Sequence, residues 1–548
     1  MRFIFFCNPA TGQLNPLMAI IQELCLRGHK VVFCSGETAL KRVQKIQNKL
    51  GSLQQVDLCP QQETWSKYDV MFYSLGGGSA LDDYTSEAFN DPERFHKGGR
   101  SRPGQIWTWV QTFMELVPPA SESYKNAVYT VKNMIESVDA DMVIVDNFSP
   151  FAVDGARLSK RPFIETCPGA TSAVVNNVSL FGKPLPMSGG RSGNGGILVF
   201  ISNVIFMINW LMFALFTEWP RIRRAFRRDV LGLEPVDIVC DSLMTPTPGM
   251  LPQQVATITF NVAGVDFYHQ DSFDRSVYFV GPCFPPSEKQ TTPVCMPHAP
   301  VSPAVPSQPS SIASTPTVVD MQFEKEGSPL TRVSSDPVKL WLDKAYENGS
   351  PVVYINMGSI FYYRRVDYDN MVEGLKLLQK RIPDVQVLWK VPKLPKHIQP
   401  IPSPDEGKLP LFIRQEGWLE CVQTVLEHPA VSVIVHHGGG NSFNEALFYG
   451  HRQFCISQWV DTHDIGAFVK HCGVGLWADA SPEFVPEDIG DKLAQLIEDK
   501  DSTFERCVLA WRNKTKQAGG TSTAADIIES YVTDFHYKSG SSRRPFVC

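Results

Sequence analysis

The sequence predicts an α/β protein made of two doubly wound halves, each built on a parallel sheet. Three observations predict it: the chain opens with alternating strand and helix, a proline-rich stretch interrupts this alternation, and the alternation then resumes. The 548 residues allow two or three domains at about 150 residues each, and 43% hydrophobic with 20% charged residues is ordinary for a globular protein. A fibrous or wholly disordered chain is therefore excluded.

The opening of the chain predicts a βαβ unit. Its expected parts are a strand at 3–7, a turn at 8–12, a helix at 16–26 and a strand at 31–34. Asn15 can cap this helix, and Pro16 suits its first position because a missing N–H costs nothing there. Gly28 suits the left-handed residue that follows the helix.

A further apolar strand at 141–146 ends on Asp146. If it is parallel to the first strand, Asp146 and the turn at 11–13 share the carboxyl edge of one sheet. Open α/β sheets bind their ligands at this edge.

The stretch from 285 to about 335 is rich in proline, serine and threonine, and predicts a disordered insertion because it has too little apolar area to bury. After it, strands are expected at 352–356, 385–391 and 431–435, a helix at 369–380, and closing helices within 487–535. We therefore expect an α/β domain at 1–284, a linker at 285–335, a second α/β domain at 336–520, and a carboxy-terminal helix and tail at 521–548. The closing helix is expected to pack back on the first domain.

The stretch 197–216 contains no charged residue and is followed by Arg221, Arg223, Arg224, Arg227 and Arg228. Its length suffices to cross a bilayer. A single span would separate the two halves, and Asn203 and Asn209 would need partners in lipid, so a span is the least favoured interpretation. A helix resting on a membrane surface and a helix covered by protein, or lining an apolar pocket, both stay open.

Net charge and cysteine content limit which partners the protein can bind and in which cellular compartment it is expected. The formal net charge of −6 provides no basic field that would attract nucleic acid. The apolar run after Met1-Arg2 is too short for a signal peptide, so we expect a cytoplasmic protein, with peripheral membrane contact through 197–216 as an option. The 13 cysteines form no CxxC pair, and we expect them to be reduced core residues.

The stretch His436-His437-Gly438-Gly439-Gly440-Asn441-Ser442 follows an apolar strand and leads into a helical pattern. Glycines let backbone approach a ligand, and the partial positive charge of a helix N-terminus favours phosphate. The stretch is neither a Walker loop nor a GxGxxG fingerprint, and a plain strand-to-helix connection is the alternative. Glu445, one helical turn further on, can accept from ribose hydroxyls or be a solvated helix residue.

Together these motifs resemble the UDP-dependent glycosyltransferases of family one, especially the small-molecule glucosyltransferases of fungi and bacteria. The resemblance is carried by Trp418, His437-Gly438-Gly439, Asn441-Ser442, Glu445, Gly450, Asp461, Gly358-Ser359 and the first loop Gly12-Gln13-Leu14-Asn15-Pro16. It covers nearly the whole chain except 285–335. It implies the GT-B fold, in which two Rossmann-like domains face each other across the donor cleft, the first binding the acceptor and the second the UDP-sugar.

The resemblance implies a role for each of these residues. Trp418 stacks on uracil, His437 hydrogen-bonds a phosphate, and Glu445 binds the ribose. The diphosphate cradle is completed by Gly358, Ser359, Gly439, Asn441 and Ser442. Asp461 accepts hydrogen bonds from hydroxyls of the transferred sugar. Thr462 is the next donor-binding residue, and it stands where the family has a glutamine. This difference leaves the identity of the sugar open, although glucose is the commonest in the family.

The first loop departs from the family's pattern. Family members carry there a histidine that acts as general base on the acceptor, and an aspartate that orients it. Here Gln13 stands in the histidine's place, and an amide cannot take a proton at neutral pH, whereas Asp146 matches the aspartate. Three accounts remain: Asp146 or another group is the base, the acceptor is acidic or nucleophilic enough to need none, or the chain binds UDP-sugar without efficient turnover.

The implied function is transfer of a hexose, glucose in first place, with inversion, from a UDP-sugar to a lipophilic acceptor such as a terpenoid, sterol or polyketide of secondary metabolism. No cofactor and no metal are expected, since the sequence has no DxD-like acidic pair in a suitable loop. A monomer is expected. The alternatives are a catalytically impaired UDP-sugar-binding accessory protein and a glycolipid-forming enzyme at a membrane surface.

Overall fold

The computed structural model describes residues 1–50, 53–55, 69–75, 120–175, 180–181, 185, 196–236, 249, 251–268, 270–285, 336–359, 361–392, 409–419 and 421–539. The expected linker at 285–335 lies, apart from its first residue, outside the described residues.

An eight-stranded sheet forms the amino-terminal half, in the order β3-β4-β2-β1-β5-β6-β7-β8. The strands are β1 (Arg2–Phe6), β2 (Lys30–Ser35), β3 (Leu53–Gln55), β4 (Val70–Ser74), β5 (Met142–Asp146), β6 (Phe163–Cys167), β7 (Gln254–Thr259) and β8 (Val277–Phe279). All neighbours pair in parallel. Parallel strands are covered on both faces, which explains why Phe3 to Phe6 read as one continuous apolar run and are fully buried.

The helical elements of this half are α1 (Thr11–Leu26), α2 (Leu40–Leu50), α6 (Glu122–Val138), α7 (Pro150–Ser159), α8 (Ile197–Phe216) and α9 (Glu218–Ala225), with short turns η1 (Glu37–Ala39), η3 (Thr171–Val174), η4 (Phe226–Val230) and η6 (Gln270–Ser272). The predicted βαβ start is confirmed by β1, α1 and β2. Gly28 has the expected left-handed backbone, with φ of +83°.

The predicted start of the first helix was wrong. Helix α1 begins at Thr11 after the cap residue Ala10, and Asn15 and Pro16 lie inside it. Pro16 has no N–H to donate to the carbonyl of Gly12 one turn earlier. That carbonyl accepts instead from Nδ2 of Asn441 in the other half, at 3.0 Å, so a tertiary contact compensates the proline inside the helix.

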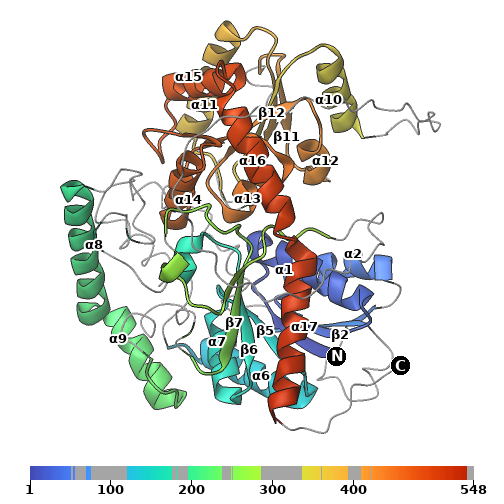
Figure 1. Cartoon of the computed structure of the whole chain (residues 1–548), viewed down its shortest axis with the longest axis vertical. Helices are drawn as coiled ribbons and strands as arrows, with labels where there is room; N and C mark the ends of the chain where they lie inside the picture. The colour runs from blue at the N-terminus through green and yellow to red at the C-terminus, as the bar shows by residue number, and fades with distance from the viewer. Residues whose placement is uncertain are drawn as a thin grey trace, which may run out of the picture.

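A six-stranded parallel sheet forms the second half, in the order β11-β10-β9-β12-β13-β14. Its strands are β9 (Val352–Asn356), β10 (Gln386–Lys390), β11 (Ile413–Glu416), β12 (Val431–His436), β13 (Arg452–Cys455) and β14 (Gly475–Trp477). Its helices are α10 (Pro337–Glu347), α11 (Arg365–Arg381), α12 (Val422–Leu426), α13 (Gly440–Tyr449), α14 (Val460–His471), α15 (Pro486–Glu498), α16 (Thr503–Gln517) and α17 (Gly520–Ser539). Figure 1 shows this half above the first, except for α17, which extends down beside the first half.

The last helix returns to the first half. Helix α17 runs down beside α1 (Figure 1), and Ala524, Ala525 and Ile528 are buried in the same core as residues of β1. Arg27 Nη1, just after α1, pairs with Asp526 at 2.6 Å and with Glu529 at 2.9 Å. The carboxy-terminal segment therefore ties the two halves together through both apolar burial and ion pairs.

The apolar stretch 197–216 forms helix α8 with these same bounds, and it lies at the edge of the molecule (Figure 1). Only Asn203, Phe213 and Ala214 are buried along it, whereas Leu198 is 74% exposed and Ile208 56%. The interpretation of a helix covered by protein is therefore wrong for most of its length. By length and composition α8 could cross a membrane, although a single such helix is weak support for a span.

Candidate active site

The carboxyl edges of the two sheets carry most of the residues that the sequence analysis selected. In the first sheet the strand order reverses at β1, which lies between β2 and β5, and Asp146 is the last residue of β5. In the second sheet the order reverses at β9, between β10 and β12. Gly358 follows β9 and His437 follows β12. Such reversal points are where open α/β sheets bind ligands.

The N-terminus of α13 joins the two halves. Asn444 Nδ2 donates to Oδ1 of Asn261 at 3.0 Å, in addition to the bond from Asn441 to Gly12. A Cβ on Gly440 would lie only 2.5 Å from the carbonyl oxygen of Pro168, so this close approach requires glycine. The first turns of α1 and α13 are therefore held together, which brings the candidate donor residues beside the candidate acceptor loop.

His437 lies between two glycines. A Cβ on Gly358 would be 2.7 Å from Cε1 of the imidazole, and a Cβ on Gly439 would be 2.6 Å from the same atom. The ring is buried and Nδ1 has no hydrogen-bond partner. Burial, together with His436 and Lys390, lowers the pKa of His437 to about 3. The imidazole is therefore neutral at pH 7, and it can offer one N–H and one unpaired nitrogen to a ligand.

The remaining cradle residues are at the surface of the same region. Ser359 is exposed after the β9 turn, and Ser442 is partly exposed in the first turn of α13, whose cap residue is Gly439. The side-chain nitrogen Nδ2 of Asn441 donates to the carbonyl of Gly12. Binding of phosphate by this side chain would compete with that bond. Backbone N–H groups at the start of α13 stay suited to an anion.

Trp418, Glu445 and a lysine that the sequence analysis missed lie together. The Trp418 indole is 68% exposed, as a stacking platform requires, and Nζ of Lys390 is 5.2 Å from its ring centroid. Burial raises the pKa of Glu445 to about 7, and nearby Lys390 opposes this shift. Lys390 ends β10 opposite Asn356, so its signal in the sequence was a charged residue closing an apolar strand at the ligand edge.

Asp461 and Thr462 occupy the first turn of α14, and they differ in what they can offer to a sugar. Burial and the neighbouring Asp464 raise the pKa of Asp461 to about 7. The Thr462 side chain is fully buried, and its hydroxyl accepts from the backbone N–H groups of Gln458 at 2.9 Å and Trp459 at 2.8 Å. A direct contact of this hydroxyl with sugar would have to break these bonds.

Asp146 and Gln13 occupy the acceptor side. Asp146 is fully buried, Ser149 Oγ donates to its Oδ2 at 3.0 Å, and its Oδ1 has no hydrogen-bond partner. Burial raises the pKa of Asp146 to about 7, against the opposing effect of hydrogen bonds from Ser149 and from the backbone of Phe148 and Asn8. Gln13 is half-buried in the first turn of α1. An unpaired carboxylate oxygen with a pKa near neutrality has the properties of a general base, provided that the acceptor or a water reaches it.

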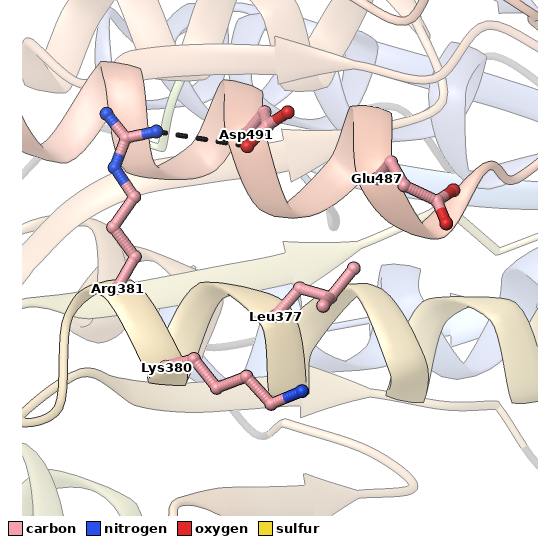
Figure 2. A pocket seen from close by; sticks show the side chains of 5 residues that line it. All are labelled: Leu377, Lys380, Arg381, Glu487 and Asp491. Atoms are coloured by element: carbon pink, nitrogen blue, oxygen red, sulfur yellow. Dashed lines mark ion pairs between the residues drawn. The ribbon is translucent and has the colours of Figure 1, made fainter.

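A shallow hollow in the second half is separate from these residues. Figure 2 shows that it lies between α11 and α15 and is lined by Leu377, Lys380, Arg381, Glu487 and Asp491. In Figure 1 these two helices are at the far end of the second half from α1. The hollow contains none of the candidate residues.

No family model matches this chain. An erythritol-mannosyl-transferase of Pseudozyma antarctica (strain T-34) is 24% identical to it, over 100% of this chain and 93% of that protein. A cinnamate beta-D-glucosyltransferase of Fragaria ananassa is 27% identical, over 34% of this chain and 35% of that protein. The crystal structure of the glycotransferase of kitacinnamycin superimposes with a TM-score of 0.58 at 15% identity, covering 97% of this chain and 99% of that one.

The chain is a glycosyltransferase of the GT-B fold. The predicted resemblance to family one, the predicted fold class and the predicted enzyme class are thereby confirmed. A glycosyltransferase of this kind takes a nucleotide-sugar donor and an acceptor. The identity of the sugar, the identity of the acceptor and the role of each residue stay predictions.

Proposed function

We propose that this glycosyltransferase transfers a hexose, with inversion, from a UDP-sugar to a lipophilic small molecule, at the junction of α1 and α13. The observation that supports this most is the His437 ring between Gly358 and Gly439, with Nδ1 unpaired. A neutral hydrogen-bonding ring beside a helix N-terminus suits a phosphate, and the exposed Trp418 indole suits a nucleobase.

In the proposed reaction the acceptor oxygen attacks the anomeric carbon on the face opposite the diphosphate. The new C–O bond forms as the bond between the anomeric carbon and the diphosphate oxygen breaks, and UDP leaves with the electron pair. The acceptor proton passes to Asp146, whose pKa of about 7 suits a base at neutral pH. The charge on the leaving diphosphate is stabilised by the N-terminus of α13, His437 and Ser442, so the proposal includes no cofactor and no metal.

A second candidate is mannosyl transfer to a polyol. It is favoured by the similarity to the erythritol-mannosyl-transferase, which extends over the whole chain. Acceptors that carry a carboxylate are also of interest, because a carboxylate needs no base and a relative is named a cinnamate glucosyltransferase.

The test is a screen of the wild-type and Gln13→His proteins with UDP-glucose and GDP-mannose against terpenoid alcohols, phenols, carboxylic acids, amines and erythritol, read by mass spectrometry. We expect wild type to glycosylate a lipophilic acceptor from UDP-glucose. Product from GDP-mannose and erythritol alone would replace this proposal with the polyol one. If neither protein forms product although calorimetry detects UDP-glucose binding, and no hydrolysis occurs, an accessory sugar-nucleotide binder is the better description.

We further propose that the enzyme is a cytoplasmic monomer that contacts a membrane surface through α8. The exposed apolar side chains along the helix support this, as does the exposed Arg221 after it, which can meet anionic lipid. A lipophilic acceptor would then be drawn from, or delivered to, the bilayer. Glycolipid formation is a special case of this proposal.

Replacing Leu211 by Glu is expected to reduce binding to vesicles of mixed neutral and anionic lipid by roughly tenfold or more, because it removes an exposed apolar side chain that would insert into the lipid and adds a negative charge. Leu211 is 50% exposed on α8, and Leu509, 47% exposed on α16, provides the matched control as Leu509→Glu. Vesicle flotation measures both. If wild type stays with the soluble fraction, or both variants behave alike, α8 has another role.

A further inference from the structure

We propose that Lys390 binds the diphosphate of the nucleotide donor and thereby makes the site prefer nucleoside diphosphates over nucleosides. This rests on the proposed function of the same site. The lysine was not among the residues that the family resemblance assigned. Its position beside Trp418 and the turn after β9 is given by the structure.

Lys390 is a nearly buried cation that interacts electrostatically with Glu445 but forms no close ion pair with it. It is 8% exposed, yet its ammonium group has one hydrogen bond, a long one of 3.4 Å to Oδ1 of Asn356. It forms no ion pair with any residue that the structure describes. An ammonium has three N–H donors, and a buried charge is costly unless it is paired. A ligand that supplies negative charge would provide the missing partner.

The surroundings of Lys390 indicate which ligand this is. Asn356 Oδ1 also accepts from the backbone N–H of Gly358 at 3.1 Å, so the lysine adjoins the turn that flanks His437. On its other side lies the Trp418 ring, at 5.2 Å from Nζ. A nucleotide whose base stacks on Trp418 and whose phosphates reach His437 would therefore have this ammonium beside it. The diphosphate is the anionic part of such a ligand.

An alternative role is purely positional, because Lys390 could hold the Trp418 ring in place by a cation–π contact. The two roles differ in what they predict for uridine, which has the base and ribose but no phosphate. A lysine that only orients Trp418 would affect uridine and UDP equally. A lysine that binds the diphosphate would affect UDP alone.

The experiment is calorimetric titration of the full-length wild-type, Lys390→Met, Lys390→Gln and Lys390→Arg proteins with UDP and with uridine at two salt concentrations. We expect the Met and Gln variants to bind UDP about 10- to 100-fold more weakly, as for loss of a charged hydrogen bond, with uridine changed by less than about twofold. Lys390→Arg should retain most of the affinity. The wild-type affinity for UDP should fall more steeply with salt than that of the variants.

Lys376→Met, which removes an exposed lysine of α11, is the matched control and should leave both affinities unchanged. Equal weakening of uridine and UDP in Lys390→Met and Lys390→Gln would overturn the proposal in favour of the positional role, and unchanged UDP binding would overturn it as well. Circular dichroism and melting temperature identify any variant that fails to fold, and the other substitution then decides. If the wild-type protein binds neither ligand, the proposed UDP-sugar function fails rather than the role of Lys390.

Discussion

Replacing Asp146 by Asn is expected to lower kcat by about 10²- to 10⁴-fold, the usual contribution of a general base. The reason is the unpaired Oδ1 of this buried carboxylate at the sheet edge, and the absence of a titratable side chain at Gln13. In wild type, activity should rise with pH through about 7 as Asp146 loses its proton, and then level off. The rise should disappear in Asp146→Asn. Steady-state kinetics across pH measures both effects.

Asp146→Asn is expected to lower activity without lowering stability, so the loss of catalysis can be distinguished from a loss of folding. The folded-state pKa of Asp146, about 7, lies above the ordinary value of 3.8. The native state therefore holds the proton more tightly, and this stabilisation is complete below the ordinary pKa and lost as pH rises through 7. At pH 8 Asp146→Asn removes a buried charge, so its free energy of unfolding should be equal to or above that of wild type.

Asp141→Asn, just before the opposite end of β5, is the matched control and should change kcat by less than about twofold, because it lies far from the carboxyl edge. Full activity of Asp146→Asn would contradict the proposed base. The acceptor would then need no base, and Gln13→His would bring no improvement.

Gly358→Ala is expected to lower kcat/KM and UDP affinity by roughly 10²-fold. Two costs combine: a left-handed residue with a Cβ costs about 1–2 kcal/mol, and the new methyl group would lie 2.7 Å from Cε1 of His437. The imidazole must move away from the start of α13, where its bond to phosphate is proposed. Calorimetry with UDP and steady-state kinetics measure the loss.

Gly349→Ala is the control that introduces the backbone strain of a left-handed alanine without a steric clash. Gly349 also has a positive φ, +67°, but a Cβ there would have no atom within 4 Å. It should lower stability slightly and leave UDP affinity unchanged. If Gly358→Ala binds UDP as tightly as wild type does, the packing of His437 against Gly358 has no part in donor binding.

Much of this architecture was predictable because it depends on local patterns. The strand at 352–356 was predicted with its observed bounds, since a continuous apolar run between turns is typical of a buried parallel strand. The position of Asp146 at the carboxyl edge of the sheet was predicted in the same way. The last residue of a parallel strand lies at this edge, whichever strands flank it. The composition of 197–216 likewise predicted an apolar helix.

The wrong prediction of the first helix start is explained by a contact between distant segments. Asn15 and Pro16 were expected at the helix start because local rules favour them there, but Asn441 of the other half satisfies the Gly12 carbonyl that Pro16 leaves free. For Thr462 a role in binding the UDP-sugar stays a prediction, and its hydroxyl is engaged locally by the backbone N–H groups of Gln458 and Trp459.

The sequence by itself determined the α/β class, the order of the strands along the chain and the motifs that carry the glycosyltransferase resemblance, because these depend on periodicity and on residues close in the chain. Only the tertiary structure decided that α8 is exposed, that Lys390 lies beside Trp418 and that the His437 ring is held between Gly358 and Gly439. These facts depend on which segments come together in space. Burial, and with it the pKa of Asp146 and of His437, is a property of that assembly and not of any single stretch of chain.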